Sequence, residues 1–147
     1  MEEKIRTIDE LEEAGRRYAG SLPGRFRPET LSLIETHREQ GHRCVIVSAS
    51  LVYYLRPAAR SLGIDHVIGV EMELDDSSRC TGRLAGENVR GAEKERRLTT
   101  WLDEEYGAEA ANIEMWAYGN SAGDDELLAM ADHPVWVGRR ADRNPGV

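Results

Sequence analysis

Alternating stretches of apolar and polar residues divide the chain into helices and short strands. Steps of three and four between apolar residues predict a charged helix over 2–19, with one narrow stripe formed by Ile5, Ile8, Leu11, Ala14 and Tyr18. A second helix is predicted over about 28–40, because Pro28 favours a helix start and Gly41 a helix end. Both helices precede the first predicted strand.

The rest of the chain alternates short apolar runs with helical segments. Residues 44–47 form an unbroken apolar run, which predicts a strand buried on both faces. The further predictions are strands at 67–69, 115–118 and 135–137, a hairpin over 70–84, and helices over about 51–62, 91–105 and 124–131. This order predicts an α/β domain with a parallel sheet. Ligands of such sheets bind at the carboxyl ends of the strands, where polar turns are expected at 48–50 and 119–124.

Length and charge exclude several classes of function. The chain has 147 residues, enough for one domain, and its formal net charge is −8. That charge disfavours binding to nucleic acid or to an anionic membrane surface. No apolar run approaches the roughly 20 residues of a membrane helix, and the first residues lack a secretory pattern. Cys44 and Cys80 match no zinc or disulfide spacing, so we expect a buried Cys44 and a cytoplasmic protein.

Two residues at helix starts are candidates for anion binding. A hydroxyl at Ser48, beside backbone N–H groups between a strand and a helix, suits a phosphate or a carboxylate. The structural alternative is that Ser50 caps the helix and Ser48 is a small turn residue. Lys94 lies in a first helical turn, where a cation opposes the helix dipole by roughly 0.3–1 kcal/mol. A nearby anion would explain it; the alternative is a solvated lysine balanced by Glu93 and Glu95.

The turn at 119–124 carries oxygen ligands of the kind that magnesium prefers. Its two glycines allow a tight backbone path, and Asn120 and Asp124 supply the oxygens. The alternative is an Asx-type turn in which Asp124 or Asp125 caps the following helix. The four histidines are scattered along the chain, so we expect them to be structural or exposed and to form no ligand pair.

Together these segments resemble the haloacid dehalogenase superfamily of phosphatases, in the branch that contains phosphoserine phosphatase. Residues 45–50 resemble the second family motif, a strand ending in a phosphate-binding Ser or Thr. Residues 91–94, with Leu98 four residues on, resemble the third motif, and residues 118–124 resemble the fourth. The resemblance covers about 27–140. It implies a three-layer, Rossmann-like α/β core over 27–147, preceded over 1–26 by the end of a helical cap insert.

The resemblance also implies roles for individual residues and a small phosphorylated substrate. Lys94 would neutralise the phosphoryl group and act as a catalytic residue, with Arg90 as the less favoured alternative. The phosphate-binding positions would be Ser48, Ala49, Ser50 and Lys94, and the Mg²⁺-binding positions would be Asn120 and Asp124.

Two departures from the family pattern change these expectations. Family members begin with a strand that ends in Asp-x-Asp, which supplies the nucleophile and the general acid, whereas this sequence contains no Asp-x-Asp. Asp9, the one aspartate before Ser48, lies within a predicted helix. The family usually has Asp where this chain has Asn120. We therefore expect an N-terminally truncated core, weak or absent Mg²⁺ binding, and little phosphatase activity from this chain alone.

The expected loss of the central strand affects assembly. The strands at 44–47 and 115–118 must pair with each other, leave open edges, or accept a strand from another chain, which makes a homo-oligomer a reasonable hypothesis. The alternative to an enzyme is a non-catalytic remnant that binds an anion or assembles with a partner.

Overall fold

The computed structural model describes residues 7–21 and 28–145. The chain divides into two compact units, 1–88 and 89–147, and each is described by itself. The first unit contains α1 (Ile8–Ser21), α2 (Pro28–Glu39), β1 (Val45–Leu51), α3 (Val52–Leu62), β2 (His66–Val70), β3 (Met72–Leu74) and β4 (Cys80–Leu84). The second contains α4 (Ala92–Tyr106), the 3-10 helix η1 (Gly107–Asn112), β5 (Trp116–Gly119), η2 (Ala122–Asp124), α5 (Asp125–Ala129), β6 (His133–Trp136) and η3 (Gly138–Arg143).

The strands form three pairs, two of them parallel. β1 pairs with β2 and β5 pairs with β6 in parallel, whereas β3 and β4 form the predicted antiparallel hairpin. The mixed α/β class with parallel sheet elements is therefore confirmed. In the part of the chain that the structure describes, β2 is the sole strand partner of β1, and β6 is that of β5. β1 and β5 belong to different units, so the arrangements predicted between them stay predictions.

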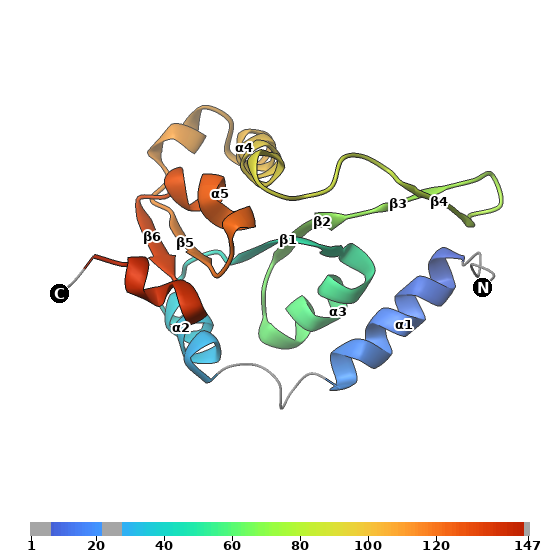
Figure 1. The fold of residues 1–147 in the computed structure, drawn as a ribbon, viewed down its shortest axis with the longest axis horizontal. Helices are drawn as coiled ribbons and strands as arrows, with labels where there is room; N and C mark the ends of the chain where they lie inside the picture. The colour runs from blue at the N-terminus through green and yellow to red at the C-terminus, as the bar shows by residue number, and fades with distance from the viewer. Residues whose placement is uncertain (1–6, 22–27, 146–147) are drawn as a thin grey trace. The chain divides into compact units, whose positions relative to one another are not determined.

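Helix α1 packs on α3 and contributes to the core of the first unit (Figure 1). Leu11 is buried there against Val52, Tyr53 and Cys80. The helix was predicted over 2–19, but Thr7 is not part of it in the structure. Residues 2–6 lie outside the described ranges. Thr7 precedes the helix, and its Oγ1 accepts a hydrogen bond from the Glu10 N–H at 3.2 Å. A threonine cap of this kind satisfies a free N–H group and favours a helix start at that position.

A glycine allows the close approach of α1 and α3. A Cβ atom on Gly15 would lie 1.8 Å from the backbone oxygen of Tyr53. No side-chain rotation can relieve an overlap with backbone, so this contact requires glycine. The predicted apolar stripe omits Gly15, because a residue without a side chain adds nothing to a hydrophobic pattern.

Strand β1 differs from its prediction in length and in burial. Residues 48–50 belong to the strand and do not form the predicted turn, because pairing with β2 resumes at Leu51 and Val70 after an irregularity. Leu51 is the N-cap of α3 and makes no side-chain cap hydrogen bond, so the interpretation of Ser50 as a cap is wrong. The expected burial on both faces is also wrong, since Val45–Val47 are half-buried. A two-stranded sheet covered by α3 hides one face better than the other.

The other elements of the first unit agree with prediction. Helix α2 begins at Pro28, and Gly41 ends it with a φ of +77°. Helix α3 ends at Gly63, which has a φ of +72°. Glycine is favoured at both positions because positive φ is costly for other residues.

The second unit departs from prediction at its last helix and strand. The helix expected over 124–131 is a 3-10 turn followed by the short α5. The strand expected over 135–137 begins earlier, because the His133 N–H bonds to the Met115 oxygen at 2.9 Å and Pro134 lies within the strand opposite Ala117. Proline usually lies outside a strand interior, so Pro134 is an unusual residue within β6.

Two further predictions concern cysteines and membranes. Cys80 is buried, whereas Cys44, expected to be buried, is half-buried because it precedes β1. No helix in the described residues is long and apolar enough to cross a membrane. The predicted boundary between cap and core at 26/27 lies where the structure describes no residues and stays a prediction.

Candidate functional site

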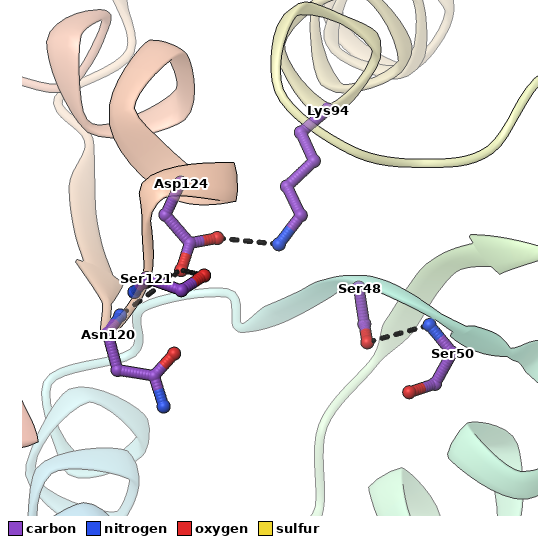
Figure 2. Close-up of polar contacts among 6 residues, drawn as sticks. All are labelled: Ser48, Ser50, Lys94, Asn120, Ser121 and Asp124. Carbon is purple, nitrogen blue, oxygen red and sulfur yellow. Dashed lines mark hydrogen bonds and ion pairs between the residues drawn. The ribbon is translucent and has the colours of Figure 1, made fainter.

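Lys94 and Asp124 form a buried ion pair in the second unit. The Lys94 Nζ donates to Asp124 Oδ1 at 2.5 Å, and the two side chains are 10% and 8% exposed (Figure 2). Lys94 lies in the first turn of α4, and Asp124 ends η2. The carboxylate is a nearby anion of the kind that would explain a cation in the first turn of a helix. Lys94 is therefore not a solvated surface lysine.

Backbone geometry brings these two residues together. Gly91, which precedes α4 with a φ of +60°, donates its N–H to the Gly123 oxygen at 3.0 Å. A Cβ on Gly119 would lie 2.7 Å from the Asp124 Cβ, so only glycine fits where β5 ends. The start of α4 is thus tied to the loop that carries Asp124.

The second carboxylate oxygen of Asp124 accepts hydrogen bonds from the loop that carries this residue. Oδ2 accepts the Asn120 N–H at 3.1 Å, the Ser121 N–H at 3.3 Å and the Ser121 hydroxyl at 3.4 Å. Ser121 is the N-cap of η2, and Asp124 completes a capping box with it. Asp124 is the N-cap residue of α5, as the Asx-turn alternative predicted, but its side chain makes no cap hydrogen bond to α5 and takes part in the capping box of η2 instead.

The charge state of Asp124 follows from these partners. Burial raises the pKa of this carboxyl group, but Lys94 lowers it by hydrogen bond and charge, and the N–H groups of Asn120 and Ser121 lower it further. The net result is a pKa below the usual value for aspartate. Asp124 is therefore ionised at neutral pH.

The oxygen donors of the loop fit a magnesium ion poorly. Both oxygens of Asp124 are already engaged, and the Asn120 side chain extends away from that carboxylate (Figure 2). The described residues contain no group of three His, Cys, Asp or Glu side chains that could hold a metal ion. Mg²⁺ usually takes one or two carboxylates. Here the single carboxylate of the loop is neutralised by Lys94.

Glu93, named in the sequence analysis only as a possible charge balance for Lys94, is a buried carboxylate. It accepts hydrogen bonds from Arg96 at 2.5 and 2.6 Å and from Arg97 at 3.1 Å. The Arg96 hydrogen bond, assisted by Arg97 and opposed by burial, lowers the pKa of Glu93 to about 2. The spacing of three and four residues from Glu93 to Arg96 and Arg97 could have indicated these ion pairs from the sequence.

The predicted phosphate-binding residues of β1 lie in the first unit. The Ser48 hydroxyl accepts the Ser50 N–H at 3.1 Å, a local bond that Figure 2 also shows. Ala49 and Ser50 are exposed, and Ser48 is half-buried. The structure brings Lys94 together with Asp124, whereas the convergence of Ser48 with that pair stays a prediction.

Arg90 remains available as the alternative cation. It is exposed, and a Cβ on Gly123 would lie 3.4 Å from its Cγ, so its stem lies along the 119–124 loop.

Two of the histidines, expected to be structural or exposed, contact each other. The Nδ1 atoms of His37 and His42 are 2.8 Å apart, so one ring donates a proton and the other accepts it. Burial lowers the pKa of His37, and His42 lowers it further. The helix end at Gly41 brings them together, since the His42 N–H bonds to the His37 oxygen at 2.9 Å. A sequence spacing of five does not reveal this contact.

Comparison with known proteins decides the family. Residues 3–129 match the family described as haloacid dehalogenase-like hydrolase, which is most of the chain. The chain belongs to this family. Its haloacid dehalogenase-like character agrees with the three motif-like segments and with the parallel strand pairs.

Named relatives include phosphatases of the phosphoserine phosphatase type. The chain is 35% identical over 127 residues to protein CicA of Caulobacter vibrioides, covering 86% of this chain and 54% of CicA. It is 26% identical over 135 residues to a histidinol-phosphatase of Neisseria meningitidis serogroup C, covering 91% and 61%. The chain thus spans between about half and three fifths of the length of these relatives.

A solved structure of a similar protein supports the fold. The probable phosphoserine phosphatase of Vibrio cholerae aligns with a TM-score of 0.59 at 25% identity, covering 80% of this chain and 34% of that one. The chain is therefore a haloacid dehalogenase-like hydrolase domain with neighbours of the phosphoserine phosphatase type.

Proposed function

We propose that this chain supplies the phosphoryl-binding part of a phosphatase that hydrolyses small phosphomonoesters. Membership of the haloacid dehalogenase-like family and the relative named histidinol-phosphatase support the reaction class. The observation that carries the proposal is the buried Lys94–Asp124 pair. A buried ammonium at the start of a helix, held by one carboxylate, is a preorganised cation for an oxyanion.

Different residues of this chain would bind the phosphoryl group and stabilise its charge. Ser48 would donate its hydroxyl to a phosphoryl oxygen, and backbone N–H groups at Ala49 and Ser50 would add to it. Lys94 would neutralise charge that develops in the transition state. In the resembling family, Mg²⁺ is bound at positions that correspond to Asn120 and Asp124.

The nucleophile is the part of the reaction that these residues lack. Covalent phosphoryl transfer needs a positioned carboxylate, and the 147 residues contain no Asp-x-Asp. Lys94 and Ser48 can bind and stabilise but cannot replace that group. We therefore expect the purified chain to show little or no turnover of phosphomonoesters.

A titration with inorganic phosphate tests the binding half of the proposal. Phosphate should shift the backbone amide resonances of residues 91–94 and 119–124, and Lys94→Met should weaken the binding at least about tenfold, through loss of a charged hydrogen bond. Arg16→Met on α1 removes one exposed positive charge and is the matched control. Absence of phosphate binding, or equal binding by the Lys94→Met variant in a folded state, would contradict the proposal.

Turnover of p-nitrophenyl phosphate tests the catalytic half. No Mg²⁺-stimulated hydrolysis above the buffer rate is expected from the chain. Robust turnover that disappears in Asp124→Ala would show that the chain finds a nucleophile elsewhere and would overturn the expectation of inactivity.

The second candidate is a non-catalytic domain that binds an anion or assembles with a partner. It is favoured by the missing Asp-x-Asp and by β1 and β5, each with a single strand partner among the described residues. Phosphate binding with no turnover even when a nucleophile-bearing segment is supplied separately would favour this candidate.

A further inference from the structure

Both carboxylate oxygens of Asp124 accept hydrogen bonds from the protein itself. Oδ1 accepts the Lys94 ammonium, and Oδ2 accepts two backbone N–H groups and the Ser121 hydroxyl. Each oxygen offers about two lone-pair positions. The donors at Oδ2 use both of its positions, and the Lys94 ammonium uses one position at Oδ1 and cancels the negative charge.

No other charged ligand of the 119–124 loop replaces Asp124. The Asn120 side chain is neutral and extends away from the Asp124 carboxylate (Figure 2), and the Ser121 hydroxyl donates to Oδ2. A divalent cation at Oδ1 would have to displace an ammonium whose side chain is 10% exposed. A buried ammonium without its partner is strongly disfavoured, because burial removes its hydration.

We propose that Lys94 is the resident cation of this loop. Its ammonium occupies the position beside Asp124 Oδ1 that a divalent cation would need, so the loop does not take up Mg²⁺ in this chain. The loop would then offer the other N–H groups of the Lys94 ammonium to an oxyanion without metal. Binding of an oxyanion by Lys94 rests on the proposed function, whereas the exclusion of Mg²⁺ does not.

The experiment follows the amide resonances of residues 119–124 while Mg²⁺ is added to the ¹⁵N-labelled full chain. The wild type should show no saturable shift up to about 10 mM, above the roughly 1 mM dissociation constants of weak divalent-cation sites. Lys94→Met frees Oδ1 and its charge, so this variant should show saturable shifts. Arg97→Met on the same helix removes a cation that pairs with Glu93 and should behave like the wild type.

A second variant keeps the test decisive if Lys94→Met does not fold. Asn120→Asp adds a carboxylate and leaves Lys94 in place, so one negative charge is no longer cancelled. Because Lys94 still occupies the position beside Asp124 Oδ1, this variant should show no saturable Mg²⁺ shift either, whereas binding would assign the exclusion to the missing carboxylate and not to Lys94. Asn112→Asp on η1 adds the same charge to another exposed position and is its control.

Three results would overturn the proposal. One is a saturable Mg²⁺ shift at these amides in the wild type. Another is a folded Lys94→Met variant that gains no Mg²⁺ binding, and the third is an Asn120→Asp variant that binds Mg²⁺ with Lys94 still in place.

Phosphate separates this proposal from the proposed function. Phosphate binding of equal strength in Mg²⁺ and in EDTA is expected, and binding that requires Mg²⁺ would overturn the metal-free site alone. A chain that binds no phosphate under either condition would contradict the proposed function, while the Mg²⁺ titrations would still decide whether Lys94 is the resident cation.

Discussion

Two buried acidic side chains beside the start of α4 have partners at very different distances along the chain. Glu93 is held by Arg96 and Arg97, three and four residues later on the same helix. Asp124 is held by Lys94, and 30 residues separate them. The first pairing forms with the helix, whereas the second needs the fold of the second unit. This difference explains why Glu93 contributes to the stability of α4 and Asp124 to the geometry of the site.

Acid titration should reveal the contribution of Glu93. Its pKa falls from 4.5 to about 2 in the folded state, so its contribution is complete above about pH 4.5 and is lost as the pH falls towards 2. The difference in unfolding free energy between the wild type and Glu93→Gln should therefore shrink across that window. Urea unfolding at several pH values measures it, with Glu95→Gln, an exposed residue of the same turn, as control. A difference that does not change between about pH 6 and pH 3 would refute this prediction.

The position of helix α1 depends partly on Gly15, a residue without a side chain. Its apolar residues Ile8 and Leu11 reach the core formed with α3 and the hairpin. Gly15 then allows backbone contact at Tyr53. Tyr18, the last residue of the predicted stripe, is 46% exposed and makes an edge contact with the Tyr54 ring at 5.6 Å. The packing of α1 is therefore set by the glycine as much as by the stripe.

Two alanine substitutions in α1 should have opposite effects. Gly15→Ala places a Cβ 1.8 Å from the Tyr53 oxygen and should lower the unfolding free energy by about 1–3 kcal/mol, because backbone must move. Gly20→Ala meets nothing within 4 Å and should raise it by a few tenths to about 1 kcal/mol, because alanine favours helix. Urea unfolding of both variants measures the effects. If Gly15→Ala stabilises the chain as much as Gly20→Ala, the close helix contact is wrong.

For the whole molecule, the parallel strands lie in two-stranded sheets. β1 and β5 each have one strand partner within the described ranges. Strand edges without partners attract other strands, which is the usual route to self-association. The exposed Leu74 and Leu84 of the hairpin offer a competing apolar surface, at 39% and 40% exposure.

Self-association at the open strand edges should depend on protein concentration. Size-exclusion chromatography with light scattering should show a mass that rises above 16.5 kDa as the concentration increases. Leu84→Lys removes apolar surface from the hairpin and leaves β1 and β5 unchanged, so it should associate like the wild type. A stable monomer at all concentrations would count against edge pairing, and a monomeric Leu84→Lys variant would assign the association to the hairpin instead.

The sequence by itself determined the order of elements, the parallel α/β class and the helix ends at Gly41 and Gly63, whereas the family was expected only from a resemblance of three segments to its motifs. These features follow from local backbone preferences and from hydrophobic period, which act between neighbouring residues. Lys94 and Asp124 were identified as candidates for the same reason, because each lies beside an element boundary.

Only the tertiary structure decided which side chains meet. It placed Lys94 on Asp124, His37 on His42 and Gly15 against Tyr53, and it extended β1 through Ser48 to Leu51. Each of these depends on the approach of backbones separated in sequence or on resumed strand pairing, and no periodicity encodes that approach. The sequence therefore showed that Asp124 carries a charge, but it did not show that Lys94 neutralises this charge.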